Sequence, residues 1–545
     1  MKSVRKIKSG FSGDTTTLSV HLNSTSKFFS ITLFAYFSGK NPPMIKNKIL
    51  PLALIFFFAS AALFGQPRAF EVSTPEKEGI PSESISSLIN SLEKDIPSVH
   101  SFTLLRHGKL VAEGWWNPYK RENPHTLWSL SKSFTSAAIG FAVQEKLLSI
   151  NDRVISFFPN DLPENPSDNL KNMRVKDLLI MSTGQRNDAF NPMSSPKDNN
   201  PVKAFLALPV DQKPGTLFIY NTGATYMLSA IIQKVTGKKL LDYLQPRLFE
   251  PLEIKNPQWG EGSGINWGGF GLAITTEDIA KFGQLYLQKG VWNGKKLLSE
   301  DWISQSSAKE VSNGSDPLGH WDAGYGYQFW RNPKYGYRAD GAFGQFCFII
   351  PELDLVLAMT SGTSNTKGIM DIVSDKFLPS LSKEPLTENP AALASLNSKL
   401  SVLALAPAEG NRSATLKKKV SGKTYELEKN DFGIKSIAFS FDKKGNNLVF
   451  ATKNGDEKIY SETGKWTPGE TSIIGSIPPI ATKKIAASSG WPSDDTFGLT
   501  IRYTESESMI KLQFKFEGNT VTMSGDRNLN FGPTKLAAVK GVVKK

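Results

Sequence analysis

The hydrophobic and polar positions first predict a domain in which strands flank a long helical region. Apolar and polar residues alternate over 101–116 on both sides of the turn His107-Gly108-Lys109, which predicts a β-hairpin. Helical spacing then predicts helices over 129–148, 175–181, 225–236 and 276–289, and strand patterns return at 324–330, 343–350 and 353–360. Because strands stand at both ends, we predict an α/β domain whose sheet is completed by distant chain segments.

The pattern changes in the last quarter of the chain. Apolar residues alternate with polar ones from Phe497 to Tyr503 and from Leu512 to Phe516, and turn signals such as Glu517-Gly518-Asn519 separate the runs. This predicts a small all-β domain over 413–545, as a sandwich or a barrel. Residues 384–412, rich in Pro, Ala and Ser, are predicted to be a linker, which leaves 67–383 to the first domain.

An apolar segment near the start predicts export. Residues 44–66 combine a short cationic start, sixteen mostly apolar residues and small residues at the end, the three parts of a secretory signal peptide. Residues 1–43 are Ser/Thr-rich without a fold pattern, so we expect them to be unstructured and Met44 to be the true start. We therefore expect a periplasmic or secreted bacterial protein that keeps no membrane span after cleavage; the alternative is an uncleaved anchor.

Charge and composition narrow the functional classes. The net charge is +13, but Lys and Arg are spread over the whole chain of 545 residues, which indicates a solvated basic surface rather than a nucleic-acid site. One cysteine, Cys347, excludes an intrachain disulfide and a cysteine-built metal site. There is no His-Glu-x-x-His and no Gly-x-Ser-x-Gly, and His125 has no evident acidic partner. We predict no metal and no cofactor, and a Ser-His-Asp triad is disfavoured.

The candidate chemistry lies in Ser129-Leu130-Ser131-Lys132. A Ser-x-x-Lys tetrad alone carries little information, because it recurs elsewhere, for example at Ser91 and Lys94. Only Ser129 opens a long, Ala-rich, apolar helix. Positions i and i+3 share a helix face, so the Lys132 amine can approach the Ser129 hydroxyl, and burial lowers a lysine pKa until the amine can accept a proton. The alternative is an ordinary helix start with a capping serine.

Two further segments accompany the tetrad: Tyr220-Asn221-Thr222 after a turn, and the glycine-rich strand entrance Ala339-Asp340-Gly341-Ala342-Phe343-Gly344-Gln345. In order and spacing the three segments resemble the class C β-lactamase and penicillin-binding protein superfamily, over about residues 75–380. They are most similar to its 6-aminohexanoate-dimer hydrolase branch. The resemblance implies a β-lactamase/transpeptidase-like α+β domain, with an antiparallel sheet flanked by helices and a helical subdomain.

The resemblance also implies roles for individual residues. Ser129 corresponds to the acylated nucleophile, Lys132 to its base and Tyr220 to the tyrosine that shares proton transfer. The backbone N–H groups of Ser129 and Ala342 correspond to the oxyanion hole. We expect the substrate to contact four further residues: Thr222, Asp340, Gly341 and Gln345.

Two departures from the superfamily pattern affect the substrate. Thr222 replaces an asparagine, and Ala339-Asp340-Gly341 lacks the Lys or His that helps to bind a carboxylate. An acidic Asp340 is expected to repel a carboxylate or to attract a cation. We therefore predict a serine hydrolase for a small ester or amide. The alternatives are a true β-lactamase or D-Ala-D-Ala carboxypeptidase, and a non-catalytic ligand-binding homologue; the sequence leaves the oligomeric state open.

Overall fold

A computed structural model describes the backbone of residues 16–24 and 27–35, and residues 69–545 apart from 195, 197, 317, 411–414 and 475–481. The chain divides into two compact units, Met1–Arg68 and Ala69–Lys545. The predicted signal peptide, 44–66, lies outside the described residues.

The first unit contains a β-hairpin. Strands β1 (Thr16–Ser24) and β2 (Lys27–Ala35) pair antiparallel, with Thr16 opposite Ala35. Residues 1–43 were expected to be unstructured, and the hairpin differs from that expectation. Both segments are rich in β-branched and aromatic residues, which favour strands even where no longer pattern is evident.

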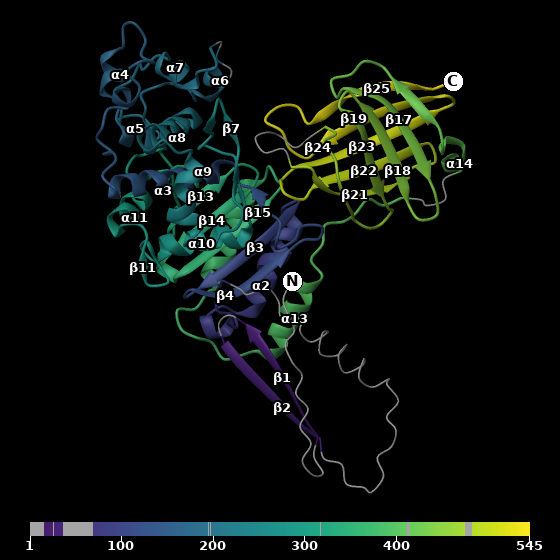
Figure 1. Cartoon of the computed structure of the whole chain (residues 1–545), viewed down its shortest axis with the longest axis horizontal. Helices are drawn as coiled ribbons and strands as arrows, with labels where there is room; N and C mark the ends of the chain where they lie inside the picture. The colour runs from purple at the N-terminus through teal and green to yellow at the C-terminus, as the bar shows by residue number, and fades with distance from the viewer. Residues whose placement is uncertain are drawn as a thin grey trace. The chain divides into compact units, whose positions relative to one another are not determined.

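A six-stranded antiparallel sheet organises the first domain of the second unit (Figure 1). Its order is β12 (Trp330–Arg331), β13 (Tyr337–Gly341), β14 (Gln345–Ile350), β15 (Leu355–Ser361), β3 (Val99–Arg106) and β4 (Lys109–Trp115). Pairing of Leu355 with Arg106 joins distant segments, as the sequence predicted, and β3 and β4 form the predicted hairpin. The strand predicted over 324–330 is wrong except at its end, because Gly324 and Gln328 adopt positive φ angles of 123° and 66° that interrupt extended backbone.

Helices cover both faces of this sheet. On one face α2 (Ser82–Asp95) and α12 (Thr366–Asp371) share an apolar cluster with the strands, which includes Leu92, Phe348 and Leu357. On the other face α10 (Thr276–Leu287) packs against β14 and β15. Alternate residues of each strand therefore pack into different apolar clusters, one on each face of the sheet. Cys347 on β14 is fully buried, and burial raises the pKa of its thiol.

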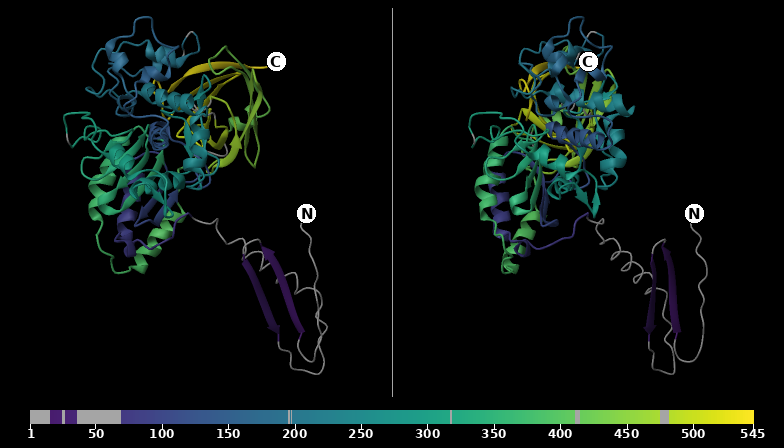
Figure 2. Two further views of the ribbon diagram at one scale, coloured as in Figure 1. Left: turned by 60° about the vertical axis from the view of Figure 1, so that its left-hand side comes forward. Right: turned by 90° about the vertical axis from the view of Figure 1, so that its left-hand side faces the viewer.

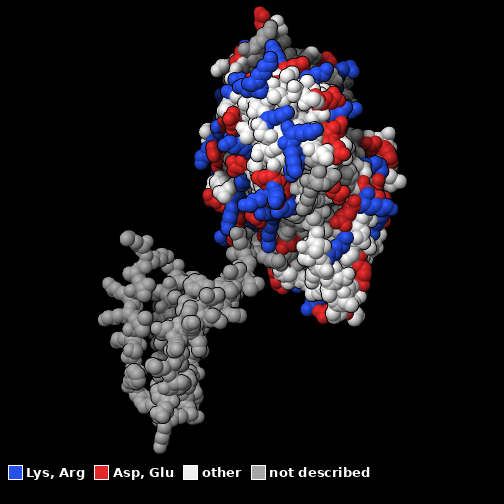
Figure 3. All heavy atoms as spheres, turned by 90° about the vertical axis from the view of Figure 1, so that its right-hand side faces the viewer, with Lys and Arg blue, Asp and Glu red and all other residues white. Residues whose placement is uncertain are grey.

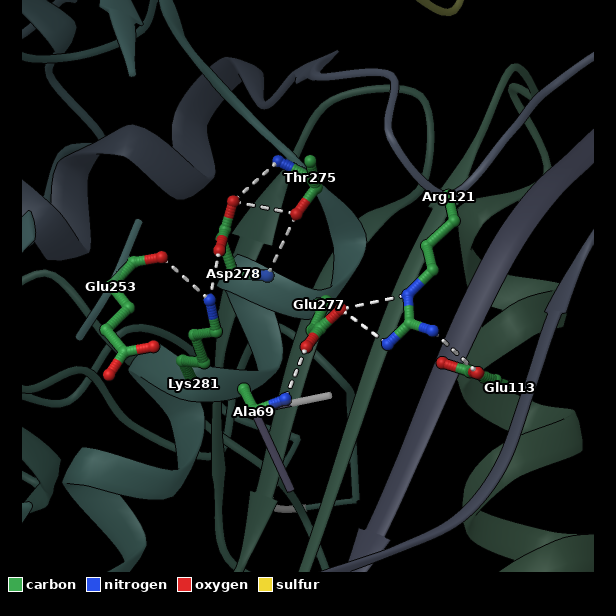
Figure 4. Close-up of polar contacts among 8 residues, drawn as sticks. All are labelled: Ala69, Glu113, Arg121, Glu253, Thr275, Glu277, Asp278 and Lys281. Carbon is green, nitrogen blue, oxygen red and sulfur yellow. Dashed lines mark hydrogen bonds and ion pairs between the residues drawn. The ribbon is translucent and has the colours of Figure 1, made fainter. Parts of the chain in front are cut away.

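Polar contacts fix the start of α10 (Figure 4). Thr275 and Asp278 form a reciprocal capping box, and Lys281 donates to Asp278 Oδ1 at 2.8 Å. Glu277 accepts two hydrogen bonds from Arg121, at 3.0 and 2.8 Å. The ion pair between Arg121 and Glu277 therefore holds the segment before β5 (His125–Thr126) against helix α10. Strand β5 ends shortly before Ser129.

A helical subdomain is inserted between the strands. Its principal helices are α3 (Ser131–Gln144) and α8 (Thr222–Thr236), which contact each other. The helices predicted over 175–181, 225–236 and 276–289 are confirmed to within three residues at each end. The remaining helices of the domain are α4 (Asp168–Asn172), α5 (Val175–Leu179), α6 (Phe190–Met193), α7 (Pro201–Leu206), α9 (Leu240–Leu244) and α11 (Glu300–Ser307). Short strands include β6 (Gln258–Trp259), which pairs with β9 (Leu272–Ile274), and β9 also pairs with β5.

The segment predicted to be a linker contains helix α13 (Pro390–Ser401). Leu396 is 1% exposed in the same apolar cluster as α2, and Asn389 and Lys399 donate to Glu83 and Glu93 of α2. Part of 384–412 therefore belongs to the first domain. Proline at the first helical position and the capping side chain of Asn389 start the helix that the Pro/Ala/Ser composition concealed.

The C-terminal domain is an all-β barrel-like sheet of ten strands (Figures 1 and 2). Its order is β19 (Gly455–Ser461), β18 (Asn446–Thr452), β17 (Ile434–Phe441), β16 (Thr424–Leu427), β25 (Lys535–Val543), β24 (Thr520–Arg527), β23 (Met509–Glu517), β22 (Thr496–Tyr503), β21 (Lys484–Gly490) and β20 (Thr467–Glu470). The alternating residues predicted from Phe497 and from Leu512 are confirmed as its buried apolar core.

Charged side chains of both signs lie on the surface of the second unit. On the face that Figure 3 draws, Lys and Arg side chains lie among Asp and Glu side chains rather than in one continuous field. Within the described ranges, no helix combines the length and the apolar character needed to cross a bilayer.

Candidate active site

The candidate nucleophile lies in a tight turn rather than in the α-helix itself. Residues Trp128–Leu130 form a 3-10 turn, and helix α3 runs over Ser131–Gln144, so the predicted helix over 129–148 is shorter at both ends. Trp128 has a φ of 51°, a left-handed conformation that costs energy in a bulky residue. Ser129 therefore projects from a turn that the surrounding structure must hold.

Lys132 lies one turn after Ser129, as the spacing predicted. Its Nζ lies 3.1 Å from Ser129 Oγ, and its side chain is only 1% exposed. Burial lowers the pKa of Lys132 to about 7, although the charge of Asp188 opposes the shift. At neutral pH a large fraction of this amine is therefore uncharged and able to accept a proton.

Gly268 and Gly269 lie beside Lys132 and provide a second hydrogen-bond partner for its amine. Lys132 Nζ donates to the carbonyl oxygen of Gly269 at 2.7 Å, and a Cβ at Gly269 would lie 2.8 Å from Thr222 Cγ2. Gly268 has a φ of 64°, and a Cβ there would lie 2.9 Å from Thr225 O. Only glycines allow the backbone this close. Gly269 has no role that could be predicted from the sequence, because a backbone carbonyl leaves no chemical signature there.

Tyr220 lies beside the same two groups. Lys132 Nζ lies 4.9 Å from the centre of the Tyr220 ring, and Trp330 stacks on that ring at 5.5 Å. Burial raises the pKa of the phenol well above its usual value, and a hydrogen bond with Ser129 partly opposes this. At neutral pH the phenol is therefore protonated, so that it can donate a proton but is a poor base.

An acid that the sequence did not single out, Asp188, contacts the start of α8. Asp188 Oδ1 accepts from the N–H groups of Thr222 at 2.8 Å and Gly223 at 3.3 Å, and the Asp188 side chain is exposed. Its charge favours protonated Lys132 and the neutral phenol of Tyr220. Thr222 is partly buried there beside Gly269. Asp188 lies 34 residues before Thr222, and no local pattern marks it.

The end of strand β13 meets the nucleophile turn. A Cβ at Gly341 would lie 2.1 Å from Leu127 O and 3.1 Å from Leu130 N, so only glycine fits between strand and turn. Ala342 follows directly, beside the turn that holds Ser129. Phe343 then adopts a φ of 66° in the loop before β14.

Gln345 supports this loop from behind. Its Nε2 donates to the carbonyl oxygens of Ala342 at 3.1 Å and Ser361 at 2.9 Å, and its side chain is fully buried. The expectation that Gln345 contacts substrate is therefore wrong. The sequence placed it near the site, but strand alternation turns its side chain into the domain.

Asp340 is not a free anion. Its Oδ2 accepts from Arg338 Nε at 3.0 Å and Trp321 Nε1 at 3.2 Å, and the Arg338 side chain is 0% exposed. The expectation that Asp340 repels carboxylates or attracts cations is corrected, because a buried guanidinium two residues away on the same face neutralises it. Burial raises the pKa of Asp340, and Arg338 opposes this rise.

The barrel reaches this region with two segments. Its turn between β22 and β23 pairs with β5, where Thr126 N donates to Glu505 O at 3.0 Å. From the loop after β24, the ring of Phe531 lies 5.2 Å from that of Trp128 and 5.0 Å from that of Phe343. The barrel therefore packs on the neighbours of both expected oxyanion-hole donors. Neither segment carries a motif, so sequence reasoning could not place them.

His125 lies outside the cluster of Ser129, Lys132 and Tyr220. Its Nε2 lies 3.0 Å from His100 Nδ1, and burial lowers its pKa to about 4. Its partner is therefore another histidine rather than an acid. Within 69–545, outside the omitted positions, no group of three or more His, Cys, Asp or Glu side chains is placed to hold a metal ion.

A hydroxyl beside a buried amine and a phenol, on an antiparallel sheet with a helical subdomain, defines a serine hydrolase of the β-lactamase and penicillin-binding type. A family model described as Beta-lactamase matches residues 87–372, just over half of the chain. The chain belongs to this family. Its first domain has the β-lactamase/transpeptidase-like fold, and the barrel-like domain follows it.

Individual relatives are distant. The chain is 21% identical to the 6-aminohexanoate-dimer hydrolase of Paenarthrobacter ureafaciens over 53% of this chain and 79% of that protein. It is 24% identical to an Escherichia coli protein named "Putative D-alanyl-D-alanine carboxypeptidase", over 38% of this chain and 55% of that one. The octameric penicillin-binding protein homologue of Pyrococcus abyssi aligns with 85% of this chain and 99% of its own, at 17% identity and a TM-score of 0.46.

Proposed function

We propose that the protein hydrolyses a small ester or amide through a covalent acyl group on Ser129, with Lys132 as base and Tyr220 as proton donor. The observation that carries this proposal is the buried Lys132 amine, 3.1 Å from the hydroxyl and with its pKa lowered to about 7. An ordinary helix-capping serine needs no such amine. The burial of a lysine amine costs stability, and function is the physical reason to retain it.

In acylation, neutral Lys132 takes the Ser129 proton as Oγ attacks the substrate carbonyl carbon. The N–H that Lys132 donates to Gly269 O orients the amine lone pair toward Ser129. The carbonyl oxygen gains negative charge, which the N–H groups of Ser129 and Ala342 stabilise. Tyr220 donates its proton to the leaving nitrogen or oxygen and regains one from the Lys132 ammonium.

In deacylation, water attacks the Ser129 ester. Tyr220 and Lys132 relay the water proton to Ser129 Oγ as it leaves, and the acid product is released. The high pKa of the phenol suits it to carry a proton between two other groups rather than to hold a negative charge. Each group thus returns to its starting state.

The groups around the site favour substrates without a carboxylate next to the scissile bond. Asp188 is an exposed anion at the rim, Asp340 is neutralised by Arg338, and the strand offers Ala339 where a cation would bind a carboxylate. An amine-bearing or uncharged substrate fits this charge pattern. By its name, the relative from Paenarthrobacter ureafaciens hydrolyses a 6-aminohexanoate dimer.

Labelling and turnover test the proposal. A fluorophosphonate probe should add to Ser129, as read by intact mass and peptide mapping, and Ser129→Ala should remove the adduct. Ser131→Ala is the matched control and should still label, because the hydroxyl oxygen of this neighbouring serine accepts a hydrogen bond from Leu272 N–H at 3.1 Å. If the parent protein takes no label while a known family member does, the non-catalytic homologue is favoured.

A substrate panel separates the hydrolase alternatives. We expect p-nitrophenyl esters and small linear amides to be turned over by the parent and not by Ser129→Ala. Nitrocefin and a D-Ala-D-Ala peptide should stay near the Ser129→Ala level. Efficient turnover of either would instead support a β-lactamase or a carboxypeptidase, for which the name of the Escherichia coli relative provides a reason.

We also propose that the protein is exported, on the basis of the 44–66 segment. N-terminal sequencing of the protein from fractionated cells should find a chain that starts after this segment, in the periplasm or the medium. A chain that retains the segment in the membrane fraction would support the anchor instead.

A further inference from the structure

A cavity separate from the Ser129 site lies between the first domain and the outer face of the barrel. It has a volume of about 510 Å³. Strands β22 and β23 form one wall, and residues 97–98, 362–364 and 405–409 form much of the other. The volume suits a small organic molecule.

Arg502 on β22 lines this cavity and has an unusual environment. It points away from the barrel core, yet it is only 8% exposed because the first domain covers it. Its Nη1 donates to Ser98 Oγ at 2.8 Å, and its buried Nε–H has no hydrogen-bond partner. In the part of the chain that the structure describes, no carboxylate forms an ion pair with this guanidinium.

A buried cation without an anion is costly, so such charges in proteins are normally paired or bind a ligand. The guanidinium carbon of Arg502 lies 5.5 Å from the centre of the Trp466 ring, and the guanidinium also interacts with the Tyr119 hydroxyl, but neither side chain supplies a negative charge. Burial and the Arg502 charge itself hold the pKa of His100 well below its usual value, and burial raises the pKa of Tyr119 to about 12. Both side chains are therefore neutral at pH 7.

The rest of the lining matches an organic anion. Lys511 adds a second positive charge from the neighbouring strand, and Thr500 adds a hydroxyl. Met509, Leu529 and Pro407 provide apolar surface. Glu409 is the one carboxylate among the lining residues, and it is exposed.

We propose that this cavity is a binding site for a small organic carboxylate, whose oxygens accept hydrogen bonds from Arg502 while its apolar body contacts Met509 and Leu529. The ligand would join the two domains, because Ser98 belongs to one and Arg502 to the other. It is distinct from the hydrolysed substrate, since none of the lining residues is one of the candidate catalytic groups.

Calorimetric titration of the full chain with sodium benzoate tests the proposal, at pH 7 and at an ionic strength held constant with NaCl. We expect one binding site per chain. Arg502→Met should weaken the binding of benzoate by about tenfold or more, because a charged hydrogen-bonded contact is removed. Lys511→Met should weaken binding by about threefold, in keeping with its exposure. Lys515→Met, an exposed lysine on the same strand, is the matched control and should bind like the parent.

Thermal melting keeps the test interpretable if a variant is unstable. Without added anion, Arg502→Met should melt no lower than the parent, because it replaces an unpaired buried charge with an apolar side chain. Benzoate should raise the melting temperature of the parent and not that of Arg502→Met. Equal shifts in both would overturn the proposal. Phosphate that binds as tightly as benzoate would overturn the assignment to an organic anion.

Discussion

The core beneath Ser129 and the core of the barrel are both buried, but their side chains differ in polarity. In the barrel, the aromatic rings of Phe439, Phe514 and Phe516 pack against one another, with ring centres 5.1 to 5.2 Å apart for the pairs that include Phe439. Under Ser129, the buried side chains include Lys132 and Gln328, each held by backbone carbonyls. Burial in the barrel stabilises the fold, whereas burial near Ser129 perturbs a pKa at the expense of stability. Variants should separate these two effects.

Lys132→Met should produce the largest effect on turnover. Loss of the base should reduce kcat/KM by about 10³-fold or more, in line with the activation that a nucleophile needs. The melting temperature should stay equal or rise, because a buried amine is removed. Steady-state kinetics and calorimetry on one preparation check both parts. A large fall in melting temperature would mean that Lys132 supports the fold rather than the chemistry.

Gly341→Ala should impair turnover at the junction of strand and turn. The added Cβ would lie 2.1 Å from Leu127 O, so the backbone beside Ala342 must move. Loss of one oxyanion-hole donor costs about 10²–10³ in kcat, and we expect a fall of that order with a smaller change in KM. Gly498→Ala is the control, because its nearest atoms lie at 3.7 Å and no clash arises. Equal losses of kcat in Gly341→Ala and Gly498→Ala would contradict the role given to the contact between Gly341 and Leu127.

Phe439→Ala should show the opposite behaviour. Truncation of a fully packed aromatic ring costs about 3–5 kcal/mol of unfolding free energy. Below the melting transition, kcat should remain within about twofold of the parent, because this ring does not contact the site. Denaturant unfolding and ester turnover at low temperature give the two values. Loss of turnover in the folded protein would show that the barrel core and the site are coupled.

The pH profile should report the Lys132 amine. We expect kcat/KM to rise about tenfold per unit below pH 7 and to level off above it, because only the neutral amine accepts a proton. The pKa of Lys132 in the folded protein is lowered from 10.5 to about 7, so the unfolded chain binds more protons between these two pH values. The contribution of Lys132 to the free energy of unfolding is therefore fully present above pH 10.5 and is lost as the pH falls to about 7. Asp188→Asn should move the midpoint to lower pH, because the Asp188 charge favours the ammonium. A profile that is flat from pH 5 to 9 would contradict the assignment of the base.

Phe531→Ala should reduce turnover less than the changes at Lys132 and Gly341, and this residue lies where the two regions meet. The ring packs on Trp128 and Phe343 but is 71% exposed, so we expect a change in kcat/KM of about three- to tenfold. Phe531→Leu should restore most of it. Val542→Ala, at another exposed apolar residue of the barrel, is the control and should leave turnover unchanged.

The sequence by itself determined the local features of this protein. The alternation around Phe497 and Leu512 gave the barrel strands, and the i, i+3 spacing of Ser129 and Lys132 placed an amine beside a hydroxyl. Both follow from the periods of strand and helix, which need only neighbouring residues. The glycine at 341 was also visible, although its reason, contact with Leu127, was not.

The tertiary structure alone decided what each group faces. Gln345 turned inward, and Arg338 neutralised Asp340. The charge of Asp188 acts on the Lys132 amine, although Asp188 comes from a segment without a motif. Phe531 and Arg502 likewise gained their surroundings only when the barrel packed on the first domain. Charge and burial depend on residues far apart in the chain, so no local pattern encodes them.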